Sequence, residues 1–180
     1  MIINGIEFET LSDIIPKNNN LKIFFIAKTP ALKSVEIGHY FQGRQGKSFW
    51  NKLIEYKILN VKNGTFQDEN LINHNYGITD IVKVPRNYGN EPSKDEYIDG
   101  LERILKLIKE KKPKILVFVY KKVLDNILKY AFSIKTKSKY GFNDELEDFF
   151  GAKIFVFPMP GTPCPKEDIS KHMKELKNCI

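Results

Sequence analysis

Four short, nearly continuous apolar runs constrain the fold of this chain most strongly. Residues 21–27, 76–82, 115–120 and 152–157 have the length and the content of β-branched and aromatic residues that buried strands have. The segments between them repeat apolar residues at steps of three and four, which is typical of helices. Strands that alternate with helices predict a parallel sheet covered on both faces, with a ligand crevice beyond the carboxyl ends of the strands.

The predicted helices have recognisable boundaries. Ser93 and Glu96 have the spacing of a capping box, so the clearest helix begins there, and it must end before Pro113 because proline cannot continue it. We also predict a helix from a Ser48 cap to Ile58, a helix over residues 123–132, and an exposed, lysine-bearing connection over residues 133–148.

The composition is that of one folded domain over residues 1–180, with an N-terminal arm at 1–20 and a core at 21–178. Hydrophobic residues make up 42% and charged residues 28%. No apolar run reaches the roughly 18 to 20 residues that cross a bilayer, and no secretory signal is evident, so we expect a cytoplasmic protein. Two cysteines are too few for a disulfide framework or a cysteine-based metal site, and no metal is predicted. The net charge of +7 favours a polyanionic partner, although a lysine-rich solvated surface has the same total.

Four segments resemble, in the same order, motifs of the mismatch-specific uracil-DNA and thymine-DNA glycosylases. Gly38-His39-Tyr40-Phe41 and the following residues to Trp50 are similar to that family's Gly-His-aromatic to Gly-Asn-x-Phe-Trp segment. The other segments are the strand at 76–82, the helix at 93–112 and the loop at 159–162. The resemblance covers roughly residues 21–178. It implies a three-layer α/β/α domain with a four-stranded, mostly parallel sheet, no cofactor, and a pocket at the carboxyl edge of the sheet for a base flipped out of DNA. We expect double-stranded DNA as the partner, and a monomer is the simplest expectation.

The resemblance places the reaction at residues 27–31. There the family has Gly-x-Asn-Pro-Gly, whose asparagine positions the attacking water, and this chain has Ala27, Lys28, Thr29, Pro30 and Ala31. A threonine hydroxyl can hold a water but cannot reproduce both ends of an amide. We therefore expect weaker activity, or activity on another base. Some branches of the wider superfamily have no polar residue here, so the threonine does not exclude catalysis.

Three further side chains complete the candidate pocket. Phe41 stands twelve positions after Thr29, where the family places the ring that stacks on the flipped base; as an alternative, Phe41 anchors its loop to the core. Lys28 could act as a desolvated amine near the sugar, but a phosphate contact is the simpler interpretation. His39 could support the leaving group as a protonatable donor, or it is a structural loop histidine. By resemblance, the Met159 loop also contacts the substrate.

The loop near the C-terminus should lie on DNA and, by resemblance, include a residue that enters the vacated stack. No leucine or arginine occupies the expected place, so Pro163 or Cys164 could press on a base step, or the prolines simply make a rigid loop. The residues that we predict to contact DNA are Arg44, Lys47, Pro160, Gly161, Thr162, Pro163, Cys164 and Lys166.

The predicted function is that of a monofunctional DNA glycosylase of base excision repair. It would hydrolyse the N-glycosidic bond of uracil, or of a related deaminated or mismatched base, after base flipping. The alternative is a catalytically weak or inactive DNA-binding protein that inspects damaged bases. An enzyme acting on a free nucleotide is disfavoured, because no glycine-rich phosphate loop follows the first strand.

Overall fold

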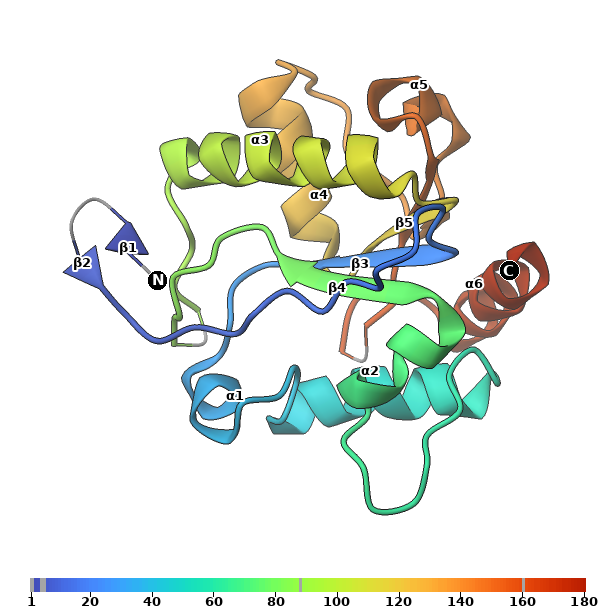
Figure 1. Cartoon of the computed structure of the whole chain (residues 1–180). Coiled ribbons are helices and arrows are strands. Elements are labelled where there is room, and N and C mark those ends of the chain that lie inside the picture. Colours follow the sequence, from blue (N-terminus) through green and yellow to red (C-terminus); the bar gives the residue numbers. More distant parts are fainter. Residues whose placement is uncertain (1, 4–5, 88, 160) are drawn as a thin grey trace.

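A mixed five-stranded sheet forms the centre of the molecule. The computed structural model describes residues 2–3, 6–87, 89–159 and 161–180, and the strand order is β4-β3-β5-β7-β6 (Figure 1). The four predicted strands are present and parallel: β3 (Ile23–Ala27), β4 (Tyr76–Asp80), β5 (Ile115–Phe118) and β7 (Lys153–Val156). The prediction of only four strands is wrong. A fifth, β6 (Gly141–Phe142), pairs antiparallel with β7 and is too short to show any periodicity in the sequence.

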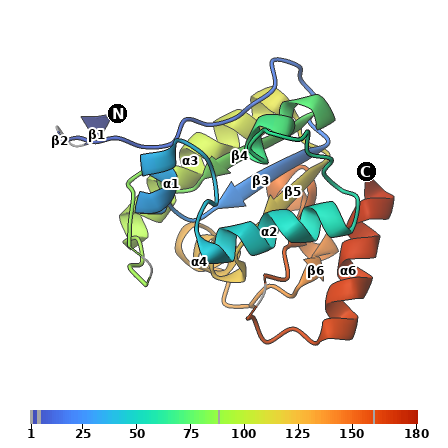
Figure 2. The same cartoon turned by 90° about the horizontal axis from the view of Figure 1, so that it is seen from below.

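Helices cover both faces of the sheet, which confirms the three-layer arrangement. Figures 1 and 2 show α3 (Lys94–Lys111) and α4 (Lys121–Ala131) on one face and α2 (Arg44–Glu55) on the other. Successive strand residues point to opposite faces, so Phe24 packs in the α3 and α4 core while Phe25 packs against α2. The remaining helices are α1 (Leu32–Ile37), α5 (Glu147–Phe150) and α6 (Lys166–Cys179), with single 3₁₀ turns at Asp68–Asn70, Ile72–His74 and Asp144–Leu146.

One predicted helix start is confirmed and another is wrong. At α3, the Ser93 hydroxyl accepts the Glu96 N–H and the Glu96 carboxylate accepts the Ser93 N–H, as a capping box requires. By contrast, α2 begins four residues before Ser48, after Gly43, and the Ser48 hydroxyl donates to the Arg44 carbonyl inside the helix. A serine inside a helix can make the same kind of hydrogen bond, so the presence of Ser48 does not by itself show where α2 begins.

The lysine-bearing stretch 133–148 is more firmly attached than predicted. Asp125 of α4 accepts hydrogen bonds from both the N–H and the hydroxyl of Ser138, at 2.8 and 2.7 Å. The buried Asn143 side chain then bonds to the backbone of Lys139 and Gly141. The stretch therefore leads into β6 as an ordered edge of the sheet.

The N-terminal arm packs along the sheet edge. After the short strands β1 (Ile2–Ile3) and β2 (Ile6–Glu7), the chain runs beside β4, where Ile14 and Ile78 exchange two backbone hydrogen bonds (Figure 1). Leu11 is buried in the α2-side core. No helix in the described ranges is long and apolar enough to span a membrane.

Candidate active site

The order in which successive strands join the sheet changes direction at β3, and this change indicates where the ligand crevice lies. The chain passes from β3 to β4 on one side and then crosses to β5 on the other side. The loops that follow β3 and β5 therefore diverge at the carboxyl edge of the sheet, where ligands bind in open α/β sheets. Residues 27–31 lie at this point, as the sequence predicts.

The loop of residues 27–31 is held along its length by the segment that follows β4. The carbonyls of Ala27, Lys28 and Pro30 accept hydrogen bonds from the backbone N–H groups of Ile81 (2.9 Å), Val82 (3.1 Å) and Arg86 (3.0 Å), respectively. Pro30 is buried, whereas Ala31 is exposed. Thr29 is half-buried, and within the described part of the chain its hydroxyl has no hydrogen-bond partner. A rigid loop thus presents an uncommitted hydroxyl, which is able to orient a water.

Lys28 pairs with a carboxylate at the crevice. Its Nζ lies 3.4 Å from Glu91 Oε2, and about a quarter of its side chain is exposed. A lysine engaged in an ion pair with a carboxylate is suited to electrostatic contacts. The geometry therefore favours an electrostatic or phosphate-binding role for Lys28 over a nucleophilic one.

Phe41 sits in an unusual backbone conformation that a glycine makes possible. Its φ is +58°, in the left-handed region that residues with a side chain seldom adopt. Gly46 packs directly on the Phe41 backbone, where any Cβ would clash with the Phe41 carbonyl. The half-exposed ring rests on Phe49 and Trp50, at centroid distances of 4.8 and 5.9 Å. Phe41 is thus anchored on the core and also keeps part of its surface accessible for stacking.

His39 is held by structural contacts. Its Nδ1 lies 2.9 Å from Asp68 Oδ1, and its ring stacks on Phe66 at 3.7 Å. The other Asp68 oxygen accepts the Tyr40 N–H at 2.8 Å, so this fully buried carboxylate fixes the loop that carries Phe41. These contacts favour the structural interpretation of His39. Asp68 carries no motif that marks it, and the sequence analysis missed it.

Met159 lines a separate hollow at the ends of β5 and β7. It is buried, and with Tyr120, Phe157 and Thr162 it borders a cavity of about 300 Å³ that Thr29 and Phe41 do not line. The Thr162 hydroxyl donates to the Met159 carbonyl at 2.7 Å and stabilises the loop. Aromatic contacts connect the two regions, since Phe49 packs on Phe157 at 4.9 Å as well as on Phe41.

The predicted DNA contacts fall into two groups. Arg44 and Lys47 are exposed on the first turn of α2, and Lys166 is exposed at the start of α6; none of the three has an ion-pair partner among the described residues. In the loop, Gly161 and Pro163 are exposed and Thr162 and Cys164 are half-buried, whereas Pro160 lies outside the described residues. Burial and the nearby Asp168 raise the pKa of the Cys164 thiol, which therefore stays neutral.

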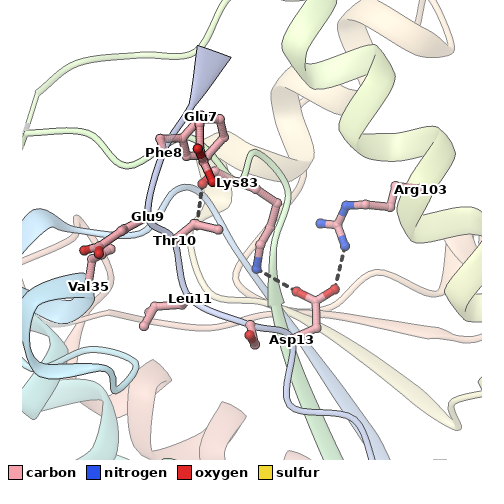
Figure 3. Close-up of a pocket in the computed structure, with 10 residues that line it drawn as sticks. Glu7, Phe8, Glu9, Thr10, Leu11, Asp13, Val35, Lys83 and Arg103 are labelled. Carbon is pink, nitrogen blue, oxygen red and sulfur yellow. Dashed lines mark hydrogen bonds and ion pairs between the residues drawn. The ribbon is translucent and has the colours of Figure 1, made fainter. Parts of the chain in front are cut away.

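A partly buried polar cluster that includes Asp13 of the N-terminal arm is the main feature that the sequence analysis missed. Figure 3 shows the Asp13 carboxylate between Lys83 and Arg103, each at 2.7 Å. Next to it, Asp80 ends β4 opposite Ala27. Burial raises the pKa of Asp80 to about 7, against the opposing effect of Lys83, and its Oδ2 has no partner among the described residues. An acid within an apolar run, as in residues 76–82, is the one signal that could have indicated Asp80.

The described residues include no cluster of three or more His, Cys, Asp or Glu side chains suited to a metal ion. The residues predicted for the site supply a hydroxyl, an aromatic ring and exposed cations. These groups can position water, stack on a base and contact phosphates.

Comparisons with known proteins identify the family of the chain. Residues 16–162 match the family model of the uracil DNA glycosylase superfamily, a span that contains Thr29, Phe41 and Met159. The chain is 26% identical over 134 residues to the G/U mismatch-specific uracil DNA glycosylase of Schizosaccharomyces pombe, and the alignment covers 73% of this chain. It covers 41% of that relative, so the chain matches less than half of the relative's length. The chain belongs to the uracil DNA glycosylase superfamily.

Proposed function

We propose that this protein is a DNA glycosylase that hydrolyses the N-glycosidic bond of uracil, or of a related deaminated or mismatched base, flipped out of double-stranded DNA. The observation that carries the proposal is the rigid Thr29 loop, with its uncommitted hydroxyl at the switch point of the sheet. The superfamily match and the activity named for the fission-yeast relative support a glycosylase in general. The protein would act as a monomer in base excision repair.

In the proposed reaction, the bond between the base and C1′ breaks and its electron pair leaves with the base. A water adds its oxygen to C1′ and gives up a proton, which neutralises the departing base anion. Thr29 orients that water through its hydroxyl, and Phe41 stacks on the base, a contact worth about 1–3 kcal/mol. Lys28 adds positive charge at the crevice, which favours both the DNA phosphates and the departing base anion.

One observation favours a second candidate, a protein that inspects altered bases without cleaving them. Thr29 replaces the asparagine of the family's motif, and Ala27 and Ala31 replace its two glycines, which limits how closely the backbone approaches a substrate. This candidate keeps Phe41 and the exposed cations of α2 and α6. It requires DNA binding that depends on the lesion and on salt, because phosphate contacts release counterions.

Single-turnover incubation with duplexes that carry U·G, U·A, T·G or hypoxanthine separates the two candidates. Abasic product is detected by alkaline cleavage, with Phe41→Ala as the matched variant. Release that Phe41→Ala reduces supports the glycosylase. If no duplex releases a base while lesion-dependent binding persists, the inspecting protein is the correct candidate. If salt-sensitive DNA binding is also absent, both candidates are wrong.

A further inference from the structure

Glu91, in the loop between β4 and α3, collects four donors from three separate parts of the fold. Its Oε1 accepts hydrogen bonds from the Tyr97 hydroxyl at 2.7 Å and from the Asn126 amide at 3.1 Å. Its Oε2 lies 3.4 Å from Lys28 Nζ and 3.0 Å from Lys122 Nζ. A carboxylate has about four lone-pair positions, so this one is fully used.

Glu91 is charged at neutral pH. Partial burial raises its pKa, but the hydrogen bonds from Tyr97 and Lys122 and the charge of Lys28 outweigh that effect, so the pKa lies below the usual value. The carboxylate also holds two ammonium groups at one oxygen, although they repel each other. Loss of its charge would free both lysines to move apart.

The donors of Glu91 lie on both sides of the crevice. Lys28 directly precedes Thr29, Tyr97 belongs to α3, and Lys122 and Asn126 belong to α4, which follows β5. Backbone hydrogen bonds already hold the Thr29 loop to the segment after β4. Glu91 also connects Lys28, at the start of this loop, to α3 and α4, at the point where the loops after β3 and β5 diverge.

We propose that Glu91 is a positioning residue, which fixes Lys28, and with it the Thr29 loop, against α3 and α4. The inference rests on the proposed glycosylase function, because the reaction that it aligns is the one at Thr29. Half-exposed ion pairs contribute little to global stability, so removal of the Glu91 charge should disturb alignment more than folding. A misaligned reacting group lowers the rate of the chemical step rather than the affinity for substrate.

The direct test compares Glu91→Gln with Glu145→Gln. Glutamine keeps the size of Glu91 and an acceptor for Tyr97 but removes the charge. Glu145 is a matched control, because it is an exposed acid paired only with Lys139 among the described residues, and its loss changes the net charge by the same amount. Single-turnover rates are measured at saturating protein, and DNA affinity by fluorescence anisotropy at two salt concentrations.

We expect Glu91→Gln to lower the rate about tenfold while DNA affinity stays the same or rises, because two lysines are freed for phosphate. Glu145→Gln should leave the rate unchanged. Glu91→Asp, which restores the charge on a shorter side chain, should recover part of the rate. An unchanged rate in Glu91→Gln, or a parallel loss of rate and affinity, overturns the proposal.

A double variant shows whether Glu91 acts through Lys28. If it does, Glu91→Gln should lower the rate of Lys28→Met by less than about twofold, whereas independent effects would multiply. If the wild-type protein releases no base, the proposed function fails and the positioning role is tested separately. A double-mutant cycle at positions 28 and 91, read from the hydrogen exchange of the backbone amides of Lys28, Thr29 and Ala31, then shows coupling if Glu91 holds Lys28, and additive changes in protection overturn that role.

Discussion

Two lysine–carboxylate pairs lie just beyond the ends of neighbouring strands, and they differ in how deeply the lysine is buried. Lys83 follows β4, is 6% exposed and lies 2.7 Å from Asp13, whose carboxylate also binds Arg103 and the Thr79 hydroxyl. Lys28 follows β3, is 24% exposed and lies 3.4 Å from Glu91. The first pair lines a hollow beside the N-terminal arm (Figure 3), and the second lies at the crevice.

We infer from this difference that the first pair stabilises the fold, whereas the second pair orders the candidate active site. A buried cation that loses its partner stays desolvated and unpaired, so the cost appears in stability. A half-exposed cation can exchange its carboxylate for water or phosphate at little cost. A lysine paired with a carboxylate therefore has a structural role in one place and a functional role in the other. Variants of the two regions, taken from the largest expected effect to the smallest, test whether these roles are distinct.

Asp13→Asn should produce the largest effect, on stability. It leaves Lys83 and Arg103 without their shared carboxylate, and we expect a loss of about 3 kcal/mol in the free energy of unfolding, measured in urea. The base-release rate of the folded fraction should be unchanged. Glu145→Gln is the control, with a change of less than about 0.5 kcal/mol. A loss of less than about 1 kcal/mol in Asp13→Asn would remove the distinction between the two pairs.

Gly46→Ala should weaken both stability and activity. Alanine normally stabilises a helix interior relative to glycine, but here its Cβ would clash with the Phe41 carbonyl. We expect a loss of about 2 kcal/mol, together with slower base release because Phe41 is displaced. Gly43→Ala is the matched control, since its Cβ would meet nothing within 4 Å. Equal effects of the two variants on unfolding and on release would contradict the proposed support of Phe41.

Asp80 should make stability depend on pH. Its pKa is raised from 3.8 to about 7, so between about pH 4 and pH 7 the folded protein holds a proton that the unfolded chain has lost. Stability should therefore fall as the pH rises through this interval, by at most about 1.4 kcal/mol for each pH unit. Asp80→Asn should abolish that part of the dependence in urea unfolding at pH 5 and pH 7.5. An identical pH dependence in the variant would mean that Asp80 titrates normally.

Thr29→Val should have the smallest effect in free energy, and on rate alone. Valine preserves the shape of threonine but removes the hydroxyl, and we expect single-turnover release to fall about tenfold, equivalent to about 1.4 kcal/mol in the barrier. Thr29→Asn, which introduces an amide that can hold a water at both ends, should raise the rate. Thermal unfolding of both variants should match the wild type. A loss of stability without a loss of rate would place Thr29 with the structural residues.

The elements that were predicted well are those whose cause is local. The apolar runs of the four parallel strands and the Ser93–Glu96 capping box depend on residues within a few positions of one another. The crevice position followed from strand alternation, and Thr29 and Phe41 followed from motif resemblance. By contrast, β6 depends on its pairing with β7, which no local pattern shows.

The sequence by itself determined the layered α/β architecture, the location of the Thr29 loop and the family, because side-chain periodicity and short motifs are properties of neighbouring residues. Only the tertiary structure decided which charges meet. Asp13 reaches Arg103, ninety positions away, and Glu91 joins Lys28 to Lys122. Such pairings depend on how distant segments pack, and burial then decides whether a carboxylate stabilises the fold, stays protonated or orders a site.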